Sequence, residues 1–164
     1  MARSRQLTPE QARHVAYDLL SRRAWSRAEL TARLARRGAP AAVARQVLAE
    51  LEAQGYVDDQ TFARQWAGAR AARQRLGSRR ITEELRLKGI ARSLAEVAVR
   101  EAFAETPEEA RALEAGRRRL PALSRRSPTR APAKLHDYLL RRGFAAEVAR
   151  SVVRQLCKVP APEE

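Results

Sequence analysis

A glycine that ends a helix recurs three times along this chain of 164 residues, and its surroundings recur with it. The segments LARRGA, LRLKGI and LLRRGF carry Gly38, Gly89 and Gly143, which lie 51 and 54 residues apart. Apolar residues stand eight and four positions before each glycine, and five and ten positions after it. A period of about 50 residues predicts tandem copies of one small structural unit that share packing surface with their neighbours.

Helix signals dominate every unit. The segments TPEQ (8–11), SRAE (26–29) and TPEE (106–109) have the form of capping boxes at helix starts. Glycine then ends the second helix of each unit, and no alternating strand pattern competes with the helical one. We therefore expect an all-α protein, an elongated array of three tandem three-helix repeats. The predicted limits are 8–56, 57–105 and 106–158, followed by a disordered tail at 159–164.

The second and third units carry further helix punctuation. Asp58 or Asp59 is expected to cap a helix that runs out near Gly77, and Ser78 to cap the next one. In the third unit the first helix is expected to meet a proline-containing loop at Pro121.

Aromatic side chains are few, and their spacing favours packing. Phe62 and Trp66 lie at core spacing on one predicted helix, and Tyr56 stands beside its cap, so all three are expected in the core. Trp25, just before a helix start, is expected to form the hydrophobic staple of that cap.

The charge is large and unevenly distributed. With 33 basic and 19 acidic residues the net charge is +14, which favours a polyanionic partner such as nucleic acid. Residues 1–39, 70–90 and 111–130 carry +6, +5 and +6, whereas residues 40–62 and 92–109 carry −3 each. The first and second helices of the units are thus basic, and the third helices of the first two units are acidic. We hypothesise a basic stripe along the array that follows a phosphate backbone; the alternative is a set of solvated helix faces.

The predicted binding side chains for DNA or a filament are the basic residues of these clusters. They are Arg36, Arg37, Arg70, Arg73, Arg75, Arg79, Arg80, Arg86, Lys88, Arg117, Arg118, Arg119, Arg141 and Arg142. The residues predicted to carry the structural motif are Gly38, Gly55, Tyr56, Asp58, Asp59, Phe62, Trp66, Gly89 and Gly143.

Catalytic constellations are missing from the sequence. His14 and His136 have no metal-ligand partner one turn away, and the single cysteine, Cys157, has no CxxC companion. We therefore predict a binding protein without enzymatic activity, cofactor or metal. The lone cysteine, and the lack of a signal peptide or a membrane-spanning run, predict a cytoplasmic protein with no membrane partner.

Taken in order, the units resemble the RecX family of bacterial regulators of the RecA recombinase. The resemblance is carried by LEAQGYVDDQTFARQW (51–66), RLGSRRITEELRLKGI (75–90) and LLRRGFAAEVARSVV (139–153), and it spans roughly residues 10–157. The family's Gly-Tyr-aliphatic-Asp/Asn-Asp turn and Phe-Ala helix match seven positions: Gly55, Tyr56, Val57, Asp58, Asp59, Phe62 and Ala63. Its Gly-x-Arg-Arg helix opening is matched at Gly77, Arg79 and Arg80. The sequence departs from the family in the proline-rich segment SRRSPTRAPAK (124–134), and more slightly at Ser78 and Thr82.

The resemblance implies a monomer that binds RecA, in particular RecA polymerised on single-stranded DNA, with double-stranded DNA as a further expected ligand. Family members are taken to lie along the filament groove and to inhibit its extension, ATP hydrolysis, strand exchange and coprotease activity. Acidic third helices would then be free to meet basic subunit surfaces.

Two other classes stay open. SRAELTARLARRG could be the first helix of a helix-turn-helix regulator of duplex DNA, although the helix after it is mostly alanine, aliphatic and acidic, a poor groove reader. A plain helical interaction scaffold without nucleic acid is the other. Binding to a specific duplex would favour the first, and salt-independent binding to protein alone the second.

Overall fold

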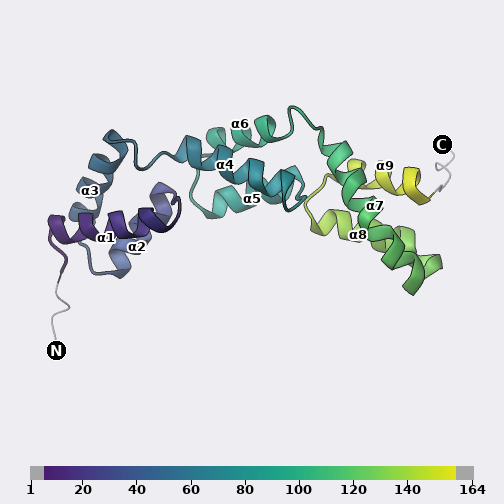
Figure 1. Cartoon of the computed structure of the whole chain (residues 1–164), viewed down its shortest axis with the longest axis horizontal. Helices are drawn as coiled ribbons and strands as arrows, with labels where there is room; N and C mark the ends of the chain where they lie inside the picture. Colours follow the sequence, from purple (N-terminus) through teal and green to yellow (C-terminus); the bar gives the residue numbers. More distant parts are fainter. Residues whose placement is uncertain (1–5, 158–164) are drawn as a thin grey trace.

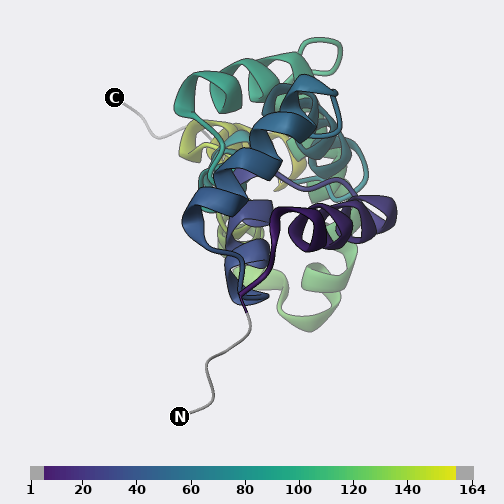
Figure 2. The same ribbon diagram turned by 90° about the vertical axis from the view of Figure 1, so that its left-hand side faces the viewer.

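The computed structural model describes residues 6–157, which form nine α-helices and one short 3₁₀-helix and contain no strand. The first unit comprises α1 (Pro9–Arg22), α2 (Arg27–Arg36) and α3 (Ala41–Ala53). The second comprises α4 (Asp59–Ala72), α5 (Ser78–Leu87) and α6 (Arg92–Ala102). The third comprises α7 (Glu108–Arg126), η1 (Pro128–Arg130), α8 (Ala131–Arg141) and α9 (Ala146–Cys157). The units follow one another along the long axis of the molecule (Figure 1), and a view turned by 90° looks toward the first-unit end (Figure 2), so the predicted elongated all-α array is confirmed. The tail predicted at 159–164 lies outside the described residues.

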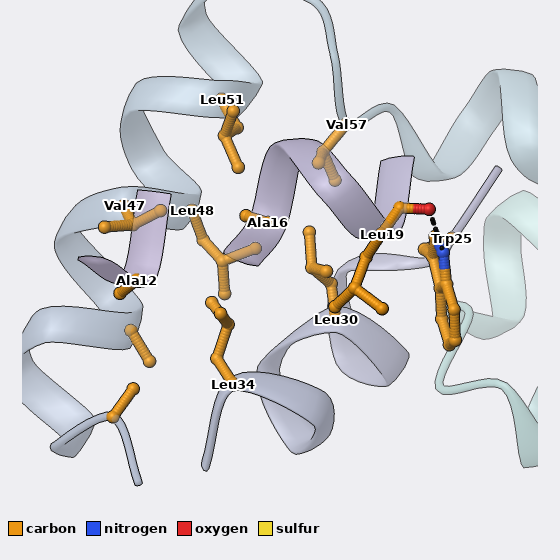
Figure 3. Packing of buried hydrophobic residues seen from close by; sticks show 12 residues of the cluster. Ala12, Ala16, Leu19, Trp25, Leu30, Leu34, Val47, Leu48, Leu51 and Val57 are labelled. Carbon is orange, nitrogen blue, oxygen red and sulfur yellow. Dashed lines mark hydrogen bonds between the residues drawn. The ribbon is translucent and has the colours of Figure 1, made fainter. Parts of the chain in front are cut away.

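Each unit has its own hydrophobic core, and its helices pack mainly on one another. In the first core, Leu30 and Leu34 of α2 face Val47, Leu48 and Leu51 of α3, and all five are buried (Figure 3). The leucines eight and four residues before the repeated glycine are thus core residues, and so are their counterparts in the other units. Since no core spans two units, the units depend on their junctions for a fixed arrangement.

An ion pair repeats with the same period as the glycines. Arg13 of α1 pairs with Glu50 of α3 at 2.8 Å, and Arg64 of α4 pairs with Glu101 of α6 at 2.8 Å, each partner 51 residues from its counterpart. Hydrogen bonding to Arg13 lowers the pKa of the Glu50 carboxyl. These two carboxylates of the acidic third helices are therefore already engaged within their own units.

The capping boxes predicted at Thr8 and Ser26 form, and Asp58 caps α4 through the backbone N–H groups of Gln60 and Thr61. The hydrogen bond from the Thr61 hydroxyl is the main cause that lowers the pKa of Asp58. Gly38, Gly55, Gly89 and Gly143 all have positive φ, as the predicted helix endings require.

Two predicted caps are wrong. No capping box forms at Thr106, because Pro107 is the N-cap of α7 and has no side-chain acceptor. Gly77, not Ser78, is the N-cap of α5. The carboxylate of Glu109, which would complete the box at Thr106, accepts from the hydroxyl of Ser151 at 2.6 Å instead, and Ser78 contacts the carboxylate of Glu108, as described below.

Helix α4 ends at Ala72, five residues before the predicted end near Gly77. Arg75 adopts the left-handed region at φ 51°, and the N–H of Leu76 donates back to the carbonyl of Arg70 at 3.2 Å. This closing turn brings Leu76 into the second core. Burial of that side chain thus ends the helix early.

Helix α7 is longer than predicted, because it continues through Pro121 to Arg126. A proline removes the hydrogen bond to the carbonyl four residues back, here that of Arg117. Both Pro121 and Arg117 are exposed, so water can satisfy that carbonyl, while Leu123 beyond the proline is buried in the third core. The predicted loop is therefore helical, and only the short 3₁₀ turn at Pro128–Arg130 separates α7 from α8.

The structure confirms some of the predictions for the aromatic residues and contradicts one of them. Phe62 is buried, and Trp66 stacks on it with ring centroids 5.8 Å apart, which confirms core packing for these two residues. Trp25, the predicted staple before α2, is buried in the first core together with Leu30. Tyr56 is 58% exposed and only meets the edge of the Tyr17 ring, at 5.5 Å, so the core prediction for Tyr56 is wrong.

Candidate functional site

The first junction joins the end of α5 to the start of α2. The hydroxyl of Ser26, the N-cap of α2, donates to the carbonyl of Lys88 at 2.6 Å, and Nζ of Lys88 pairs with Glu29 at 2.8 Å. Asp59, the first residue of α4, accepts from the backbone N–H of Arg27 at 2.8 Å. Helix α2 is therefore capped partly by a carboxylate of the next unit, so the two adjacent aspartates have separate roles: Asp58 caps α4 and Asp59 caps α2.

The second junction repeats this arrangement between α8 and α5. The N–H of Gly77 donates to the carbonyl of Arg142 at 2.9 Å, and the N–H of Arg79 donates to the carbonyl of Gly143 at 3.1 Å. Glu108, the first residue of α7, accepts from the N–H of Ser78 at 2.9 Å and from its hydroxyl at 3.0 Å. The start of one unit again caps the second helix of the unit before it.

The second helices are thus joined end to end: the C-terminus of α8 meets the N-terminus of α5, and the C-terminus of α5 meets the N-terminus of α2. They follow one side of the array in Figure 1. Negative helix ends face positive ones, which is favourable for the helix dipoles. A Cβ added at Gly89 would overlap Ala28, and one added at Gly143 would overlap Arg80. The repeated glycine therefore ends a helix and also lets the next unit approach. In the first unit the N–H of Leu7 donates to the carbonyl of Gly38 at 3.0 Å.

Several predicted binding cations are held in ion pairs within the chain. Arg70 and Arg80 converge on Glu84, at 2.8 and 3.5 Å. Arg75 and Arg118 converge on Glu114, at 3.3 and 3.2 Å. Arg86 pairs with Glu83 at 2.7 Å, and Lys88 is engaged at the first junction. These side chains have part of their charge neutralised before any partner arrives.

The remaining predicted cations have no acidic partner within 4.0 Å among residues 6–157. They are Arg36, Arg37, Arg73, Arg79, Arg117, Arg119, Arg141 and Arg142. All but Arg142 are exposed. Arg142 donates to the carbonyl of Gln74 at 2.6 Å, which places it across the second junction.

Two hollows gather predicted cations from separate helices. At the first junction, Arg36 of α2 and Arg86 of α5 line a hollow of about 320 Å³ together with Arg33, Lys88 and Trp25. The guanidinium of Arg33 lies 5.2 Å from the Trp25 ring centroid. This hollow also holds the carboxylate of Glu29, which Lys88 neutralises.

In the third unit, Arg119 of α7 and Arg141 of α8 line a larger groove of about 540 Å³. Three further basic side chains, which are not among the predicted binding residues, complete it, namely Arg125, Arg126 and Lys134. The proline-rich segment 124–134 predicts a loop, so the run of basic residues is visible in the sequence but its placement on α7 and α8 is not. Arg117, Arg73 and Arg79 do not line either hollow.

Reactive groups do not gather anywhere in the described ranges. Residues 6–157 contain no group of three or more His, Cys, Asp and Glu side chains that could hold a metal ion. Burial raises the pKa of the Cys157 thiol, so this cysteine lacks the thiolate character of a nucleophile. In this part of the chain no helix has the length and apolar character needed to cross a membrane.

Comparison with protein families matches all three units in order. The models described as RecX, first, second and third three-helix domain match residues 12–51, 58–99 and 107–153. The regulatory protein RecX of Thermobifida fusca is 36% identical over 161 residues, covering 93% of this chain and 86% of the relative. The regulatory protein RecX of Mycolicibacterium vanbaalenii is 47% identical over 81 residues, 49% of this chain and 44% of its own length.

Solved structures agree on the fold. A crystal structure of RecX from Lactobacillus salivarius superposes with a TM-score of 0.79 at 16% identity, over 92% of this chain and 97% of that one. A crystal structure of a regulatory protein RecX superposes with a TM-score of 0.79 at 20% identity, over 88% and 72%. The relatives carry the name of regulatory proteins, and no catalytic family matches among these comparisons.

Proposed function

Because this chain belongs to the RecX family, we propose that it regulates the RecA recombinase by binding RecA and the RecA filament on single-stranded DNA. Bound there, it inhibits filament extension, ATP hydrolysis, strand exchange and coprotease activity. It thereby modulates recombinational repair and the SOS response, in the cytoplasm and as a monomer.

The observation that carries this proposal is the end-to-end docking of three units, which together present unpaired arginines. An extended body whose junctions are closed by hydrogen bonds can span several subunits of a helical filament, whereas a compact domain can contact only one or two. The unpaired and exposed arginines, which lie on all three units, supply contacts to a phosphate backbone or to acidic subunit surfaces. Inhibition then follows from binding itself, since a protein bound across adjacent RecA subunits opposes their rearrangement.

The test is the ATPase rate of the cognate RecA on single-stranded DNA while this protein is titrated in. We expect the rate to fall at well below one chain per RecA monomer, because one blocked site affects many subunits of a filament. An unchanged rate, with binding to bare DNA retained, would leave a nucleic-acid-binding module and remove the proposal.

Charge reversal of selected arginines tests which of them contact the filament. The variant Arg79→Glu/Arg117→Glu removes two exposed arginines that have no acidic partner in the described chain, so it should weaken filament binding about tenfold or more without unfolding the protein. The variant Arg150→Glu/Arg154→Glu makes the same change of charge on exposed residues of α9 and is the control. Equal losses in both variants would reduce the basic surface to a general charge effect.

The helix-turn-helix alternative finds little support in α3, which would be its recognition helix. Val47, Leu48 and Leu51 are buried there, and Glu50 and Glu52 are ion-paired within the chain. The face left for a major groove has few polar side chains able to read bases. Tight binding to one specific duplex, with no effect on RecA, would favour this alternative.

A further inference from the structure

The groove of the third unit concentrates positive charge more than any other hollow described above. It lies between the C-terminal part of α7 and α8, in a volume of about 540 Å³. Its lining includes five basic side chains, Arg119, Arg125, Arg126, Lys134 and Arg141. The one acidic side chain in the lining is Asp137, which leaves a net charge of +4.

These charges are available to a ligand. The four arginines of the lining have no acidic partner within 4.0 Å in the described part of the chain, unlike Arg70 or Arg86. Lys134 donates only to the hydroxyl of Ser127, at 2.9 Å. Asp137 is exposed, and in the described part of the chain its carboxylate has only the Nδ1 of His136 as a basic neighbour within 4.0 Å, at 3.9 Å. Five cations that line one groove repel one another, so an anion bound there relieves an unfavourable interaction.

The floor of the groove is apolar and aromatic. Ala122, Leu123 and Tyr138 line it, and Tyr138 is half-buried against the third core. The guanidinium groups of Arg119 and Arg142 lie 5.6 and 5.2 Å from the centroid of the Tyr138 ring. A ring framed by cations is the combination with which proteins stack a base while holding its phosphates.

The layout suits a chain of anions better than a single one. Arg119 and Arg126 are seven residues apart on α7, about 10 Å along the helix axis, and Arg141 reaches the groove from α8. One phosphate cannot contact all of them, whereas successive phosphates of a strand can. An acidic peptide matches the charges but leaves the aromatic floor unused, and a duplex cannot bring an unpaired base to Tyr138.

We infer that the groove between α7 and α8 binds single-stranded nucleic acid, with its arginines on successive phosphates and a base against Tyr138. This assigns the DNA contact of the array to the third unit. The inference rests on the proposed function only in identifying the strand as the DNA of the filament; binding by the groove itself is testable without RecA.

The experiment measures the fluorescence anisotropy of a labelled oligothymidylate titrated with the full chain at low salt, without RecA. The variant Arg125→Glu/Arg126→Glu should lose affinity about 100-fold, since two charge-assisted contacts are lost. Its slope of log affinity against log salt should fall by about 1.4. The variant Arg150→Glu/Arg154→Glu, with the same charge change on α9 of the same unit, should stay within about threefold of the unmodified chain.

Tyr138 separates stacking from charge. Tyr138→Ala should weaken binding about tenfold, because base stacking is lost, whereas Tyr138→Phe keeps the ring and should bind normally. Thermal unfolding of each variant checks that the third unit remains folded. If Tyr138→Ala unfolds, the paired arginine variants still test whether the groove holds the strand.

Three results would overturn the inference: equal losses in the two double variants, full binding by Arg125→Glu/Arg126→Glu, or displacement of the oligonucleotide by a polyglutamate peptide of matched charge. The last would identify an acidic protein segment as the occupant. The RecA ATPase assay on the same variants keeps the two proposals apart. Inhibition without groove-dependent DNA binding removes only this inference, and groove-dependent binding without inhibition removes only the proposed function.

Discussion

The two junctions of the array perform the same docking with different chemistry. At the first, Ser26 places a side-chain hydroxyl between its own helix and the carbonyl of Lys88. At the second, the counterpart of Ser26 is Gly77, whose backbone N–H contacts the carbonyl of Arg142 directly. In both, a carboxylate from the next unit, Asp59 or Glu108, caps the second helix of the unit before it.

The difference shows what each junction demands of the sequence. A bridging hydroxyl keeps the two backbones apart. The junction then has room for a side chain on one side, such as that of Ala28 beside Gly89. Direct backbone contact brings the chains closer and needs glycine on both sides, at Gly77 and Gly143. The second junction, which adjoins the basic groove, is therefore the closer of the two and should be the more sensitive to added atoms.

The largest effect is expected for Gly143→Ala. Its φ of 86° is unfavourable for any residue with a Cβ, and the added atom would overlap the backbone and Cβ of Arg80. Strain and overlap together should lower the free energy of unfolding by about 3–5 kcal/mol. Urea unfolding measures the loss, and small-angle scattering should show a more mobile third unit.

The control for this substitution is Gly55→Ala. Gly55 has a φ of 75°, but nothing lies within 4 Å of an added Cβ, so only the conformational cost remains, about 1 kcal/mol. If Gly55→Ala and Gly143→Ala cost the same, the overlap at the second junction carries no energy and the comparison of the junctions fails.

Gly77→Ala isolates the overlap from the backbone strain. Gly77 has an ordinary φ of −79°, and an added Cβ would meet the backbone of Gly143 and Phe144, which cannot swing aside. We expect a loss of about 1–3 kcal/mol by urea unfolding. In Gly68→Ala, inside α4 with nothing within 4 Å, the same atom should instead stabilise the protein by about 0.5–1 kcal/mol. A neutral Gly77→Ala would mean that the junction opens at little cost.

Much of the fold could be predicted from the sequence, because the glycines and the apolar positions around them repeat. Each unit also needs only local signals to form its helices, as at Thr8 and Ser26. The junctions could not be predicted, since Asp59 and Glu108 act on N–H groups about 30 residues away, and a cap in another unit leaves no local pattern.

The candidate site was predicted only in part, for a related reason. The unpaired arginines and the ion-paired ones look alike in sequence, and only the fold separates Arg79 from Arg80. The groove could not be predicted, because a proline such as Pro121 usually ends a helix. Here the cost of the proline within α7 is offset by the burial of Leu123. A local rule was overridden by packing that the sequence does not display.

Ser26→Ala tests the bridge at the first junction. The Ser26 hydroxyl is fully buried, accepts from the N–H of Glu29 at 3.1 Å and donates to Lys88 at 2.6 Å, so its removal leaves both partners unsatisfied. We expect a loss of about 1–2 kcal/mol in urea unfolding, with hydrogen exchange accelerated at the start of α2. Thr31→Ala is the control, since the Thr31 hydroxyl only donates to its own helix at Arg27. Equal losses in both variants would assign the effect of Ser26 to its helix alone.

The smallest effect concerns pH and distinguishes the junctions chemically, because the first contains an ionised carboxylate, Glu29, where the second has Arg80. Burial acts to raise the pKa of Glu29, but hydrogen bonds from Lys88 and from the backbone of Ser26, with the charge of Lys88, outweigh it and lower the pKa below 4.5. A carboxylate whose folded pKa is depressed stabilises the protein above its unfolded pKa, and this contribution is lost as the pH falls through the folded value.

Glu29→Gln should therefore cost about 1 kcal/mol or less at pH 7, where solvent screens part of the pair, and progressively less as the pH falls below about 4.5. Urea unfolding of the unmodified chain and of Glu29→Gln from pH 7 to pH 3 gives the difference between their free energies of unfolding. The other carboxylates titrate in both proteins, so their contribution cancels in this difference. Glu105→Gln, at an exposed carboxylate, should show no such convergence. A cost that stays constant across this range would mean that Glu29 acts through its shape as a cap rather than its charge, and the Lys88–Glu29 pair would then not distinguish the two junctions.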